Sequence, residues 1–105
     1  MPAVWVYITA SSEDEAHRIG KALVEDRLAA CTNIIPGMRS YYRWQGKVDT
    51  GAETVVIAKS RSDLVQRLTE RVKMLHSYTC PCVVALPITG GNADFLHWIE
   101  TETGS

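Results

Sequence analysis

The stretch from residue 28 to residue 60 places the tightest limit on the fold. Beyond Pro36-Gly37, apolar and aromatic side chains recur at alternate positions, which is the period of a β-strand. Turn-forming residues at 49–52 and a Val- and Ile-rich segment at 53–60 predict a second strand returning beside the first. The two expected faces of the outgoing arm carry Met38, Tyr42, Trp44 and Val48 on one side and Arg39, Arg43, Gln45 and Lys47 on the other.

The predicted hairpin is too long to stay inside a compact domain. A straight strand over residues 29–48 would reach roughly 60 Å at about 3.3 Å per residue, whereas a domain of this size has a radius of gyration of about 13 Å. The arm must therefore bend at Pro36-Gly37, overhang the domain, or both. An apolar arm that overhangs needs a cover, and we expect that cover to be another copy of the chain.

Composition and charge limit the classes of function. The chain has 105 residues, of which 46% are hydrophobic and 22% charged, and its formal net charge is −1. These values are typical of one globular domain, so we expect residues 1–105 to form a single domain. A nearly neutral charge argues against broad electrostatic binding to nucleic acid or to an anionic membrane.

The amino-terminal sequence and the cysteines predict the compartment. Residues 1–15 contain no basic segment and enter a strand directly, so we expect no signal peptide. No apolar stretch approaches the roughly 20 residues of a membrane-spanning helix. Three cysteines, an odd number, suggest no disulfide framework. We therefore expect a cytoplasmic protein with free thiols.

The remaining periodicities predict an α+β fold of the ferredoxin-like type, a β-α-β-β-α-β sandwich followed by a carboxyl-terminal helix. The expected strands are residues 3–10, 28–35 with its continuation past the bend, 53–60 and 81–88. A capping box of Ser12 and Glu15 opens a helix that ends near Asp26, with the stem of Arg27 on its apolar stripe. Ser62 is expected to cap a second helix with the stripe Leu64, Leu68, Val72 and Leu75, and Asn92 a third over residues 93–102, carrying Phe95, Leu96 and Ile99.

Three of the predicted strands are apolar on both faces. An antiparallel sheet with one face in water normally alternates apolar and polar residues. Residues 3–10, 53–60 and 81–88 lack that alternation. This pattern is a second, independent reason to expect an oligomer.

The segment 76–82 contains the most suggestive side chains for metal chemistry. His76, Tyr78, Cys80 and Cys82 are two residues apart and would share a side if the segment were extended. The Cα atoms of Cys80 and Cys82 would then be about 6.6 Å apart, within reach of one soft cation such as Cu(I) or Zn(II). The alternative is that both cysteines are small buried hydrophobic residues. Cys31 is expected to be buried mid-strand, and a ligand role there requires a partner across space.

Basic and aromatic residues in the hairpin suggest either a pocket or an interface. Arg39, Arg43, Lys47 and Lys59 could bind an acidic ligand beside the aromatic side chains of Tyr41, Tyr42 and Trp44. The same residues would also suit the rim of a subunit interface. The sequence contains no nucleophile elbow, phosphate-binding loop or dinucleotide fingerprint, and we expect no enzymatic activity.

Several of these segments together resemble the CutA family, the divalent-cation tolerance proteins. The resemblance rests on Arg27-Leu28-Ala29-Ala30-Cys31, Asn33-Ile34-Ile35-Pro36-Gly37 and Tyr42-Arg43-Trp44-Gln45-Gly46-Lys47. It continues through Glu53, Lys59, His76, Tyr78, Pro81, Ala85-Leu86-Pro87-Ile88, Gly91-Asn92 and Trp98-Ile99, and so covers nearly the whole chain.

The resemblance implies a ferredoxin-like fold, a tight homotrimer like that of the PII signalling proteins, and a cytoplasmic bacterial setting. It also implies copper tolerance and binding of divalent metals, with no enzymatic reaction. Of the family's candidate metal residues, Cys31 and His76 match. Cys82 stands where the family usually has Glu, and Cys80 where it usually has an aliphatic residue. This exchange would replace a hard oxygen ligand with soft sulfur.

Three hypotheses follow. The first is a metal-binding protein for copper or another divalent cation, with His76, Cys31, Cys80 and Cys82 as candidate ligands. The second is a PII-like module that binds a small anion at inter-subunit clefts and reports to an unidentified protein partner. The third is a structural or assembly factor. The residues expected in a ligand pocket or trimer interface are Tyr42, Trp44, Lys47, Glu53, Lys59 and Tyr78.

Overall fold

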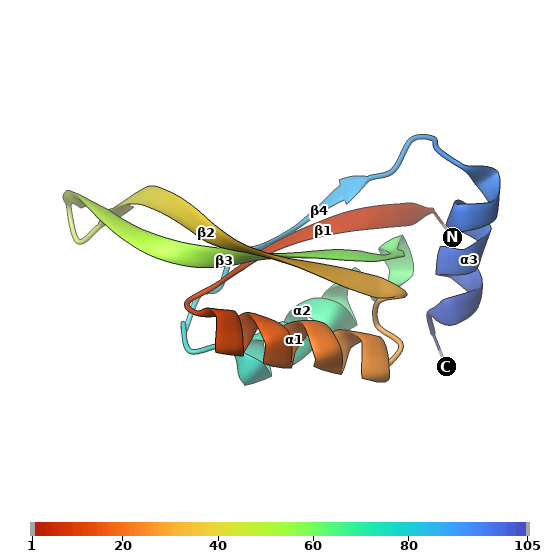
Figure 1. The fold of residues 1–105 in the computed structure, drawn as a ribbon, viewed down its shortest axis with the longest axis horizontal. Helices are drawn as coiled ribbons and strands as arrows, with labels where there is room; N and C mark the ends of the chain where they lie inside the picture. Colours follow the sequence, from red (N-terminus) through yellow and green to blue (C-terminus); the bar gives the residue numbers. More distant parts are fainter. Residues whose placement is uncertain (1, 105) are drawn as a thin grey trace.

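The computed structural model describes residues 2–104 and has the predicted order of strands and helices (Figure 1). Its elements are β1 (Ala3–Ala10), α1 (Glu13–Glu25), β2 (Cys31–Trp44), β3 (Lys47–Arg61), a 3-10 turn (Ser62–Leu64), α2 (Val65–Leu75), β4 (Val83–Pro87) and α3 (Ala93–Glu102).

The strands form one antiparallel sheet in the order β2-β3-β1-β4. Helices α1 and α2 lie side by side on one face of this sheet, and α3 lies across its end, beside the amino terminus (Figure 1). This arrangement confirms the ferredoxin-like fold with an added carboxyl-terminal helix. Among residues 2–104, no helix has both the length and the apolar character needed to cross a membrane.

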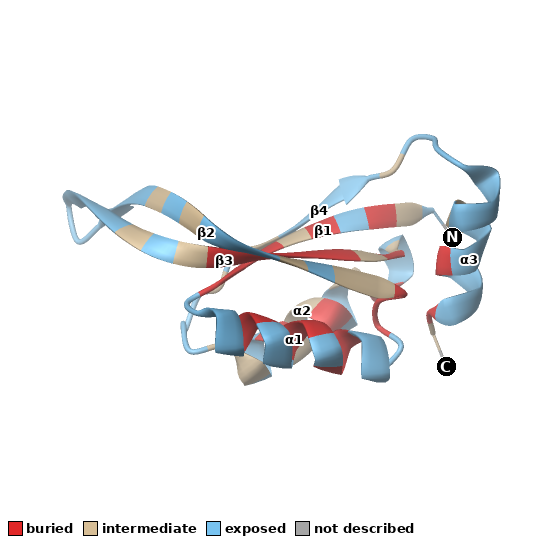
Figure 2. Cartoon of the chain, viewed as in Figure 1, coloured by how far each residue is buried: buried red, intermediate tan, exposed pale blue. Residues whose placement is uncertain are grey.

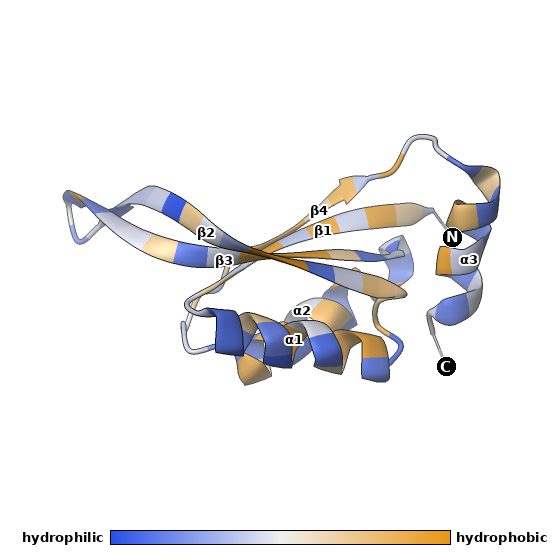
Figure 3. Cartoon of the chain, viewed as in Figure 1, coloured by the Kyte–Doolittle hydropathy of each residue, from blue (hydrophilic) through white to orange (hydrophobic). Residues whose placement is uncertain are grey.

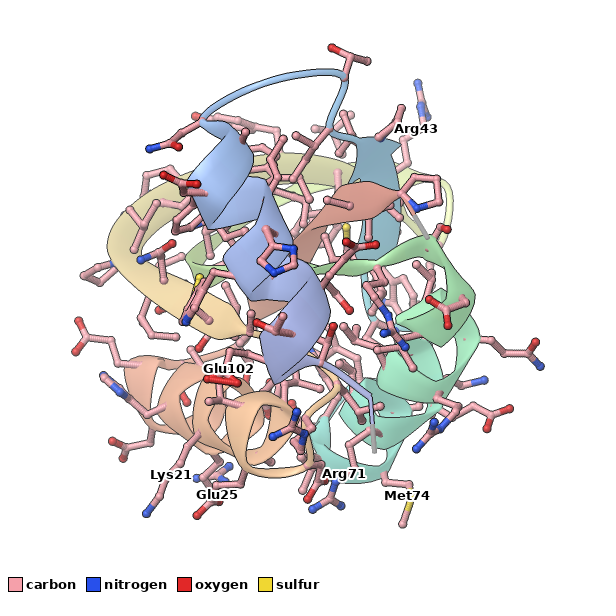
Figure 4. All side chains as sticks on the ribbon, turned by 90° about the vertical axis from the view of Figure 1, so that its right-hand side faces the viewer. Lys21, Glu25, Arg43, Arg71, Met74 and Glu102 are labelled. Atoms are coloured by element: carbon pink, nitrogen blue, oxygen red, sulfur yellow. The ribbon has the colours of Figure 1, made fainter. Side chains whose placement is uncertain are left out.

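The core lies between the helices and one face of the sheet. Val6 and Ile8 of β1 and Val56 of β3 are fully buried there, against Ile19 of α1 and Leu68 of α2 (Figure 2). Each such side chain contributes about 1.5–3 kcal/mol on burial. In the end view of Figure 4, the labelled side chains of the helical layer point away from the sheet: Lys21, Glu25, Arg71 and Met74.

In the part of the chain that the structure describes, no helix lies along the opposite face of the sheet (Figure 1). Trp5 of β1, Ile35 of β2, and Val84 and Leu86 of β4 are exposed on it. Figure 3 shows apolar residues along both β1 and β4, where no helix covers the sheet. The prediction that these strands are apolar on both faces is confirmed, and one apolar face is left in water.

The hairpin turn lies earlier in the sequence than predicted. Residues 49–52 are not a turn; they pair with β2 residues 39–42. The chain reverses instead at Gln45 and Gly46, whose φ angles are 50° and 79°. Two consecutive positive φ values are typical of the tight hairpin turn that matches strand twist. Consequently Lys47 pairs with Trp44 and shares its face, whereas Val48 pairs with Arg43, the reverse of the expected assignment.

The predicted bend at Pro36-Gly37 is confirmed. The register between β2 and β3 shifts between Ile35 and Met38, and Gly37 has a φ of 81°. Beyond this bulge the β2–β3 hairpin extends past the helical layer as an overhanging arm (Figure 1). The molecule measures 44 × 25 × 22 Å as a result.

Three predicted element boundaries differ from the structure. Strand β2 begins at Cys31 rather than at residue 28, because the N–H groups of Leu28 and Ala29 both bind the carbonyl of Leu23 and close α1. Ser62 does not cap α2 with its side chain; it begins a 3-10 turn, and the α-helix starts at Val65. Strand β4 covers only the central part of the predicted 81–88.

Arg27 fastens the carboxyl-terminal segment. It lies past the end of α1 with a φ of 58°. The prediction that its stem belongs to the apolar stripe of the helix is therefore wrong. Its guanidinium donates to the carbonyls of Gly104 at 2.7 Å and Thr101 at 3.0 Å, and Thr103 is buried. In α3, Asn92 caps as predicted, but only Ile99 is buried, whereas Phe95 is exposed and Leu96 half-buried.

We predict that Gly20→Ala destabilises the fold. A Cβ atom at Gly20 would lie 2.9 Å from Thr32 Oγ1 and 3.0 Å from Ile34 Cδ1, and Thr32 is held by its own hydrogen bond to the Gly20 carbonyl. Overpacking costs about 1–3 kcal/mol, which exceeds the gain of up to about 1 kcal/mol from helix propensity. Urea unfolding should show a lower midpoint. The neighbouring Lys21→Ala, on the exposed side of α1, should leave the midpoint nearly unchanged, and equal midpoints for both variants would contradict this account.

Candidate functional site

His76 is buried at the end of α2 and uses both ring nitrogens within the chain. Its side chain is 0% exposed. Nε2 lies 2.7 Å from the Thr9 carbonyl, which can only accept, so Nε2 carries a proton. Nδ1 accepts a hydrogen bond from the N–H of Tyr78 at 3.0 Å. The ring is therefore the neutral Nε2–H tautomer, and a metal could reach a nitrogen only if one of these bonds were broken.

Glu15 is the buried carboxylate of this region and is only 3% exposed. It accepts from the N–H groups of Ser11 and Ser77, both at 3.0 Å, and its Oε1 lies 3.4 Å from His76 Nδ1. Burial by itself raises the pKa of Glu15, but the hydrogen bonds from Ser11 and Ser77 outweigh it. The net effect holds the pKa below its ordinary value. The charged side chain thus ties the start of α1 to the loop after α2.

Sequence reasoning had assigned Glu15 only to a capping box. Half of that box is confirmed, because Ser12 Oγ accepts from the Glu15 N–H at 3.1 Å. The Glu15 carboxylate, however, reaches the N–H of Ser11 and the loop at Ser77, 62 residues away. The only sequence signal for this second contact was an acidic residue beside the apolar stripe of α1.

Tyr78 joins the loop to the hairpin. Its hydroxyl donates to Glu53 Oε2 at 3.4 Å, and its ring centroid lies 4.7 Å from that of His76. Partial burial, followed by the Glu53 carboxylate and the nearby Tyr42, raises the pKa of Tyr78 above its ordinary value of 10.0, so the hydroxyl stays neutral. Of the six residues expected in a pocket or interface, Tyr42, Glu53 and Tyr78 are therefore brought together.

The other three of these six residues lie elsewhere. Trp44 and Lys47 flank the hairpin turn at the tip of the arm, where Trp44 is 61% exposed. Lys59 lies at the other end of the sheet, where its ammonium group donates to the side chain of Asn33. These three residues do not line one pocket with Tyr78 in a single chain.

Cys80 and Cys82 are both exposed. The expected extended run from His76 is wrong, because residues 77–80 form bends and β4 begins only at Val83. The carbonyl of Cys82 accepts from the Thr9 N–H at 3.4 Å, so the segment rejoins β1 at the residue that also binds His76. The alternative of two small buried hydrophobic residues does not hold within this chain.

Cys31 is remote from the other two cysteines. It is the first residue of β2, not mid-strand, and is half-buried. The register places Cys31, Lys59, Trp5 and Leu86 in one row across the sheet, with Cys31 and Leu86 on opposite edges. Three strand spacings amount to about 14 Å, and Cys82 lies further along the sheet, beside Thr9. Cys31 therefore cannot share a cation with Cys82 in the same chain.

The donor groups of one chain do not make a closed metal site. Within residues 2–104, no three His, Cys, Asp or Glu side chains are grouped so that they could hold a metal ion. The ligand roles of His76, Cys31, Cys80 and Cys82 stay predictions. What the structure brings together is a node of Glu15, His76, Tyr78 and Glu53 with the two exposed thiols following it.

We predict that Glu15→Gln destabilises the protein at neutral pH. An amide offers one acceptor oxygen where the structure needs two, at a cost of about 1–3 kcal/mol for a buried charged acceptor. Because the folded pKa of Glu15 is depressed, its contribution is present above the unfolded pKa of about 4.3 and is lost as pH falls through the folded pKa. Urea unfolding of the parent and the variant at several pH values should converge in acid. The exposed Glu13→Gln serves as control; a pH-independent difference for Glu15→Gln would contradict the prediction.

Comparison with known proteins identifies the family. The model of the CutA1 divalent ion tolerance protein family matches residues 4–102. The Thermus thermophilus divalent-cation tolerance protein CutA is 52% identical over 99 residues, which cover 94% of this chain and 96% of that protein. The chloroplastic CutA 1 of rice is 44% identical over 103 residues, but the chain spans only 58% of its length.

Solved structures agree with these matches. The Thermus thermophilus divalent cation tolerance protein superimposes with a TM-score of 0.96 at 50% identity. The match covers 97% of this chain and 99% of the Thermus chain. The Archaeoglobus fulgidus protein, described as a periplasmic divalent cation tolerance protein CutA, gives a TM-score of 0.92 at 44% identity, with 95% and 97% covered. The resemblance found in the sequence motifs is confirmed: the chain belongs to the CutA1 divalent ion tolerance protein family.

Proposed function

We propose that this protein contributes to divalent-cation tolerance by binding the cation at the thiols of Cys80 and Cys82, within a homotrimer. The observation that carries the proposal is the exposure of two thiols one residue apart, in a chain of the CutA1 family. Thiolate sulfur selects soft cations, so the preferred metal is copper, held as monovalent Cu(I), the form that reducing conditions favour, with divalent Zn(II) as a weaker competitor.

Other donors would have to complete the site. Two sulfur atoms do not provide the four ligands of a zinc centre, and residues 2–104 of one chain offer no group of three donors. His76 would have to release the Tyr78 N–H to expose Nδ1. A neighbouring copy of the chain is the other source, which would place the cation where subunits meet.

The uncovered face of the sheet supports assembly. Trp5, Ile35, Val84 and Leu86 leave apolar area in water that a second copy would remove, at about 25 cal/mol per Å². The number three comes from the family resemblance.

The thiols also suggest the compartment. All three cysteines are free, and free thiols persist in reducing compartments such as the cytoplasm. The rice relative is named as chloroplastic and the Archaeoglobus structure as periplasmic. We propose a cytoplasmic location on the basis of the thiols.

The PII-like alternative receives less support. The polar groups gathered around His76 are the carboxylates of Glu15 and Glu53 and the neutral hydroxyl of Tyr78. Carboxylates repel a small anion, and Lys59 and Lys47 lie away from this node. No contact in the chain favours an assembly factor over either hypothesis.

We predict that the two thiols set soft-metal affinity. Competition with a Cu(I) chelator under reducing conditions should show at least tenfold weaker binding for the double variant Cys80→Val, Cys82→Glu, because both soft ligands are removed. Cys31→Ser, at the other end of the sheet, is the matched control and should bind like the parent. Equal Cu(I) affinity in the parent and the double variant would show that Cys80 and Cys82 are not ligands.

We also predict that Val84→Lys disrupts assembly while Val24→Lys does not. Val84 is 51% exposed on the uncovered sheet face, and Val24 is 39% exposed on α1. An unpaired buried charge costs several kcal/mol, whereas lysine near the carboxyl end of a helix is favourable. Sedimentation at micromolar concentration should show a trimer for the parent and Val24→Lys, and a shift towards monomer for Val84→Lys. A parent protein that sediments as a monomer would refute the assembly.

A further inference from the structure

Cys80-Pro81-Cys82 carries chemistry beyond cation binding. Both thiols are exposed and free, and a single residue separates them. Thiol reactivity depends on access as well as on thiolate character. Two accessible thiols this close in the chain meet the first requirement for an intramolecular disulfide.

The backbone between them has a length compatible with a disulfide. Pro81 holds its φ near −65°, and extended backbone of this kind advances about 3.1–3.3 Å per residue. An extended Pro81 places the two Cα atoms about 6.2–6.6 Å apart, and any bend at this residue brings them closer, so the separation falls within the usual disulfide range of about 4.4–6.8 Å. Residues 80–82 precede β4, and Pro81 has no N–H; the segment is tied to β1 by the hydrogen bond that the Cys82 carbonyl accepts from the Thr9 N–H.

The surrounding contacts make Cys80 and Cys82 each other's only intrachain thiol partner. On the amino-terminal side, Ser77 is held by Glu15, and Tyr78 by His76 and Glu53. On the other side, Cys82 is held to Thr9 through its carbonyl. Cys31, the third cysteine of the sequence, lies across the sheet, at least about 14 Å away.

We propose that Cys80 and Cys82 form a dithiol–disulfide couple in exchange with low-molecular-weight disulfides such as oxidised glutathione. One thiolate attacks a sulfur of the small disulfide, forms a mixed disulfide and releases one small thiol. The second thiolate attacks the protein sulfur of the mixed disulfide, closes the Cys80–Cys82 bond and releases the second small thiol. The two cysteines lose two protons and two electrons, and the small disulfide gains them.

Closing this ring has two consequences. Because both cysteines are exposed, a small thiol can attack the closed disulfide and reduce it again, as expected of a responsive rather than a structural bond. It also removes both sulfur donors together. Cation binding at these thiols would then depend on the redox state of the compartment.

The couple can be tested on metal-free protein, which separates it from the proposed function. The full chain, held with a chelator, is equilibrated in buffers of increasing oxidised-to-reduced glutathione ratio, quenched with acid and analysed by intact mass and peptide mapping. We expect loss of two hydrogens per chain, mapped to a Cys80–Cys82 link, and full recovery on return to reduced glutathione. Protein that stays fully reduced, or that forms mainly inter-chain disulfides, would overturn the proposal.

Single-cysteine variants test the order of the steps. Cys80→Ser and Cys82→Ser should each stop at the mixed disulfide and gain the mass of one glutathione on the cysteine of the pair that is left, Cys82 or Cys80. Cys31→Ser should form the internal disulfide like the parent. If the parent also accumulates mixed disulfides on Cys80 and Cys82 without closing the ring, the geometry is unsuitable and the couple does not exist. Failure to bind Cu(I) would leave these mass measurements unaffected, and would count against the proposed function alone.

Discussion

Burial of one carboxylate determines how three parts of the chain meet. Glu15 is nearly inaccessible to water, and a charge in such a place needs a hydrogen-bond donor for each of its oxygens. Ser11 provides one at the junction of β1 and α1, and Ser77 the other in the loop after α2. Because those donors are backbone N–H groups, the loop cannot move away without leaving the charge unpaired.

The position of the loop after α2 in turn decides where the candidate site residues that follow it lie. With Ser77 fixed, His76 reaches Thr9 and Tyr78 reaches Glu53 on the hairpin. Cys80 and Cys82 then follow in the short segment that joins β4 to the same end of β1. Cys80 and Cys82 therefore lie in a short segment that is anchored at both ends, by Glu15 and His76 on one side and by Thr9 on the other.

The sheet imposes a second constraint on the whole molecule. Two helices cover one face of four strands, and α3 covers an end rather than the second face (Figure 1). The strands are nevertheless apolar on both sides, and the hairpin arm extends beyond the helices. Both features leave apolar surface in water, which is why assembly with further copies is part of the proposed function.

Order of elements, fold class and the core face could all be predicted from the sequence, because they follow from local periodicity. Ile19, Leu23, Leu68 and Val72 repeat at helical spacing, and β1 alternates with period two.

The turn at Gln45-Gly46 could not be placed, because residues 49–52 have equally good turn chemistry and only cross-strand pairing decides between them. The extended reading of 76–82 failed because contacts with Glu15 and Thr9, more than 60 residues away, bend the segment. The family resemblance added Cys31 to the candidate ligands, but strand order separates it from Cys80 and Cys82 by the width of the sheet. Local pattern therefore determined which residues form strands, helices and core, and the long-range pairing of strands and of one buried charge decided which side chains can act together.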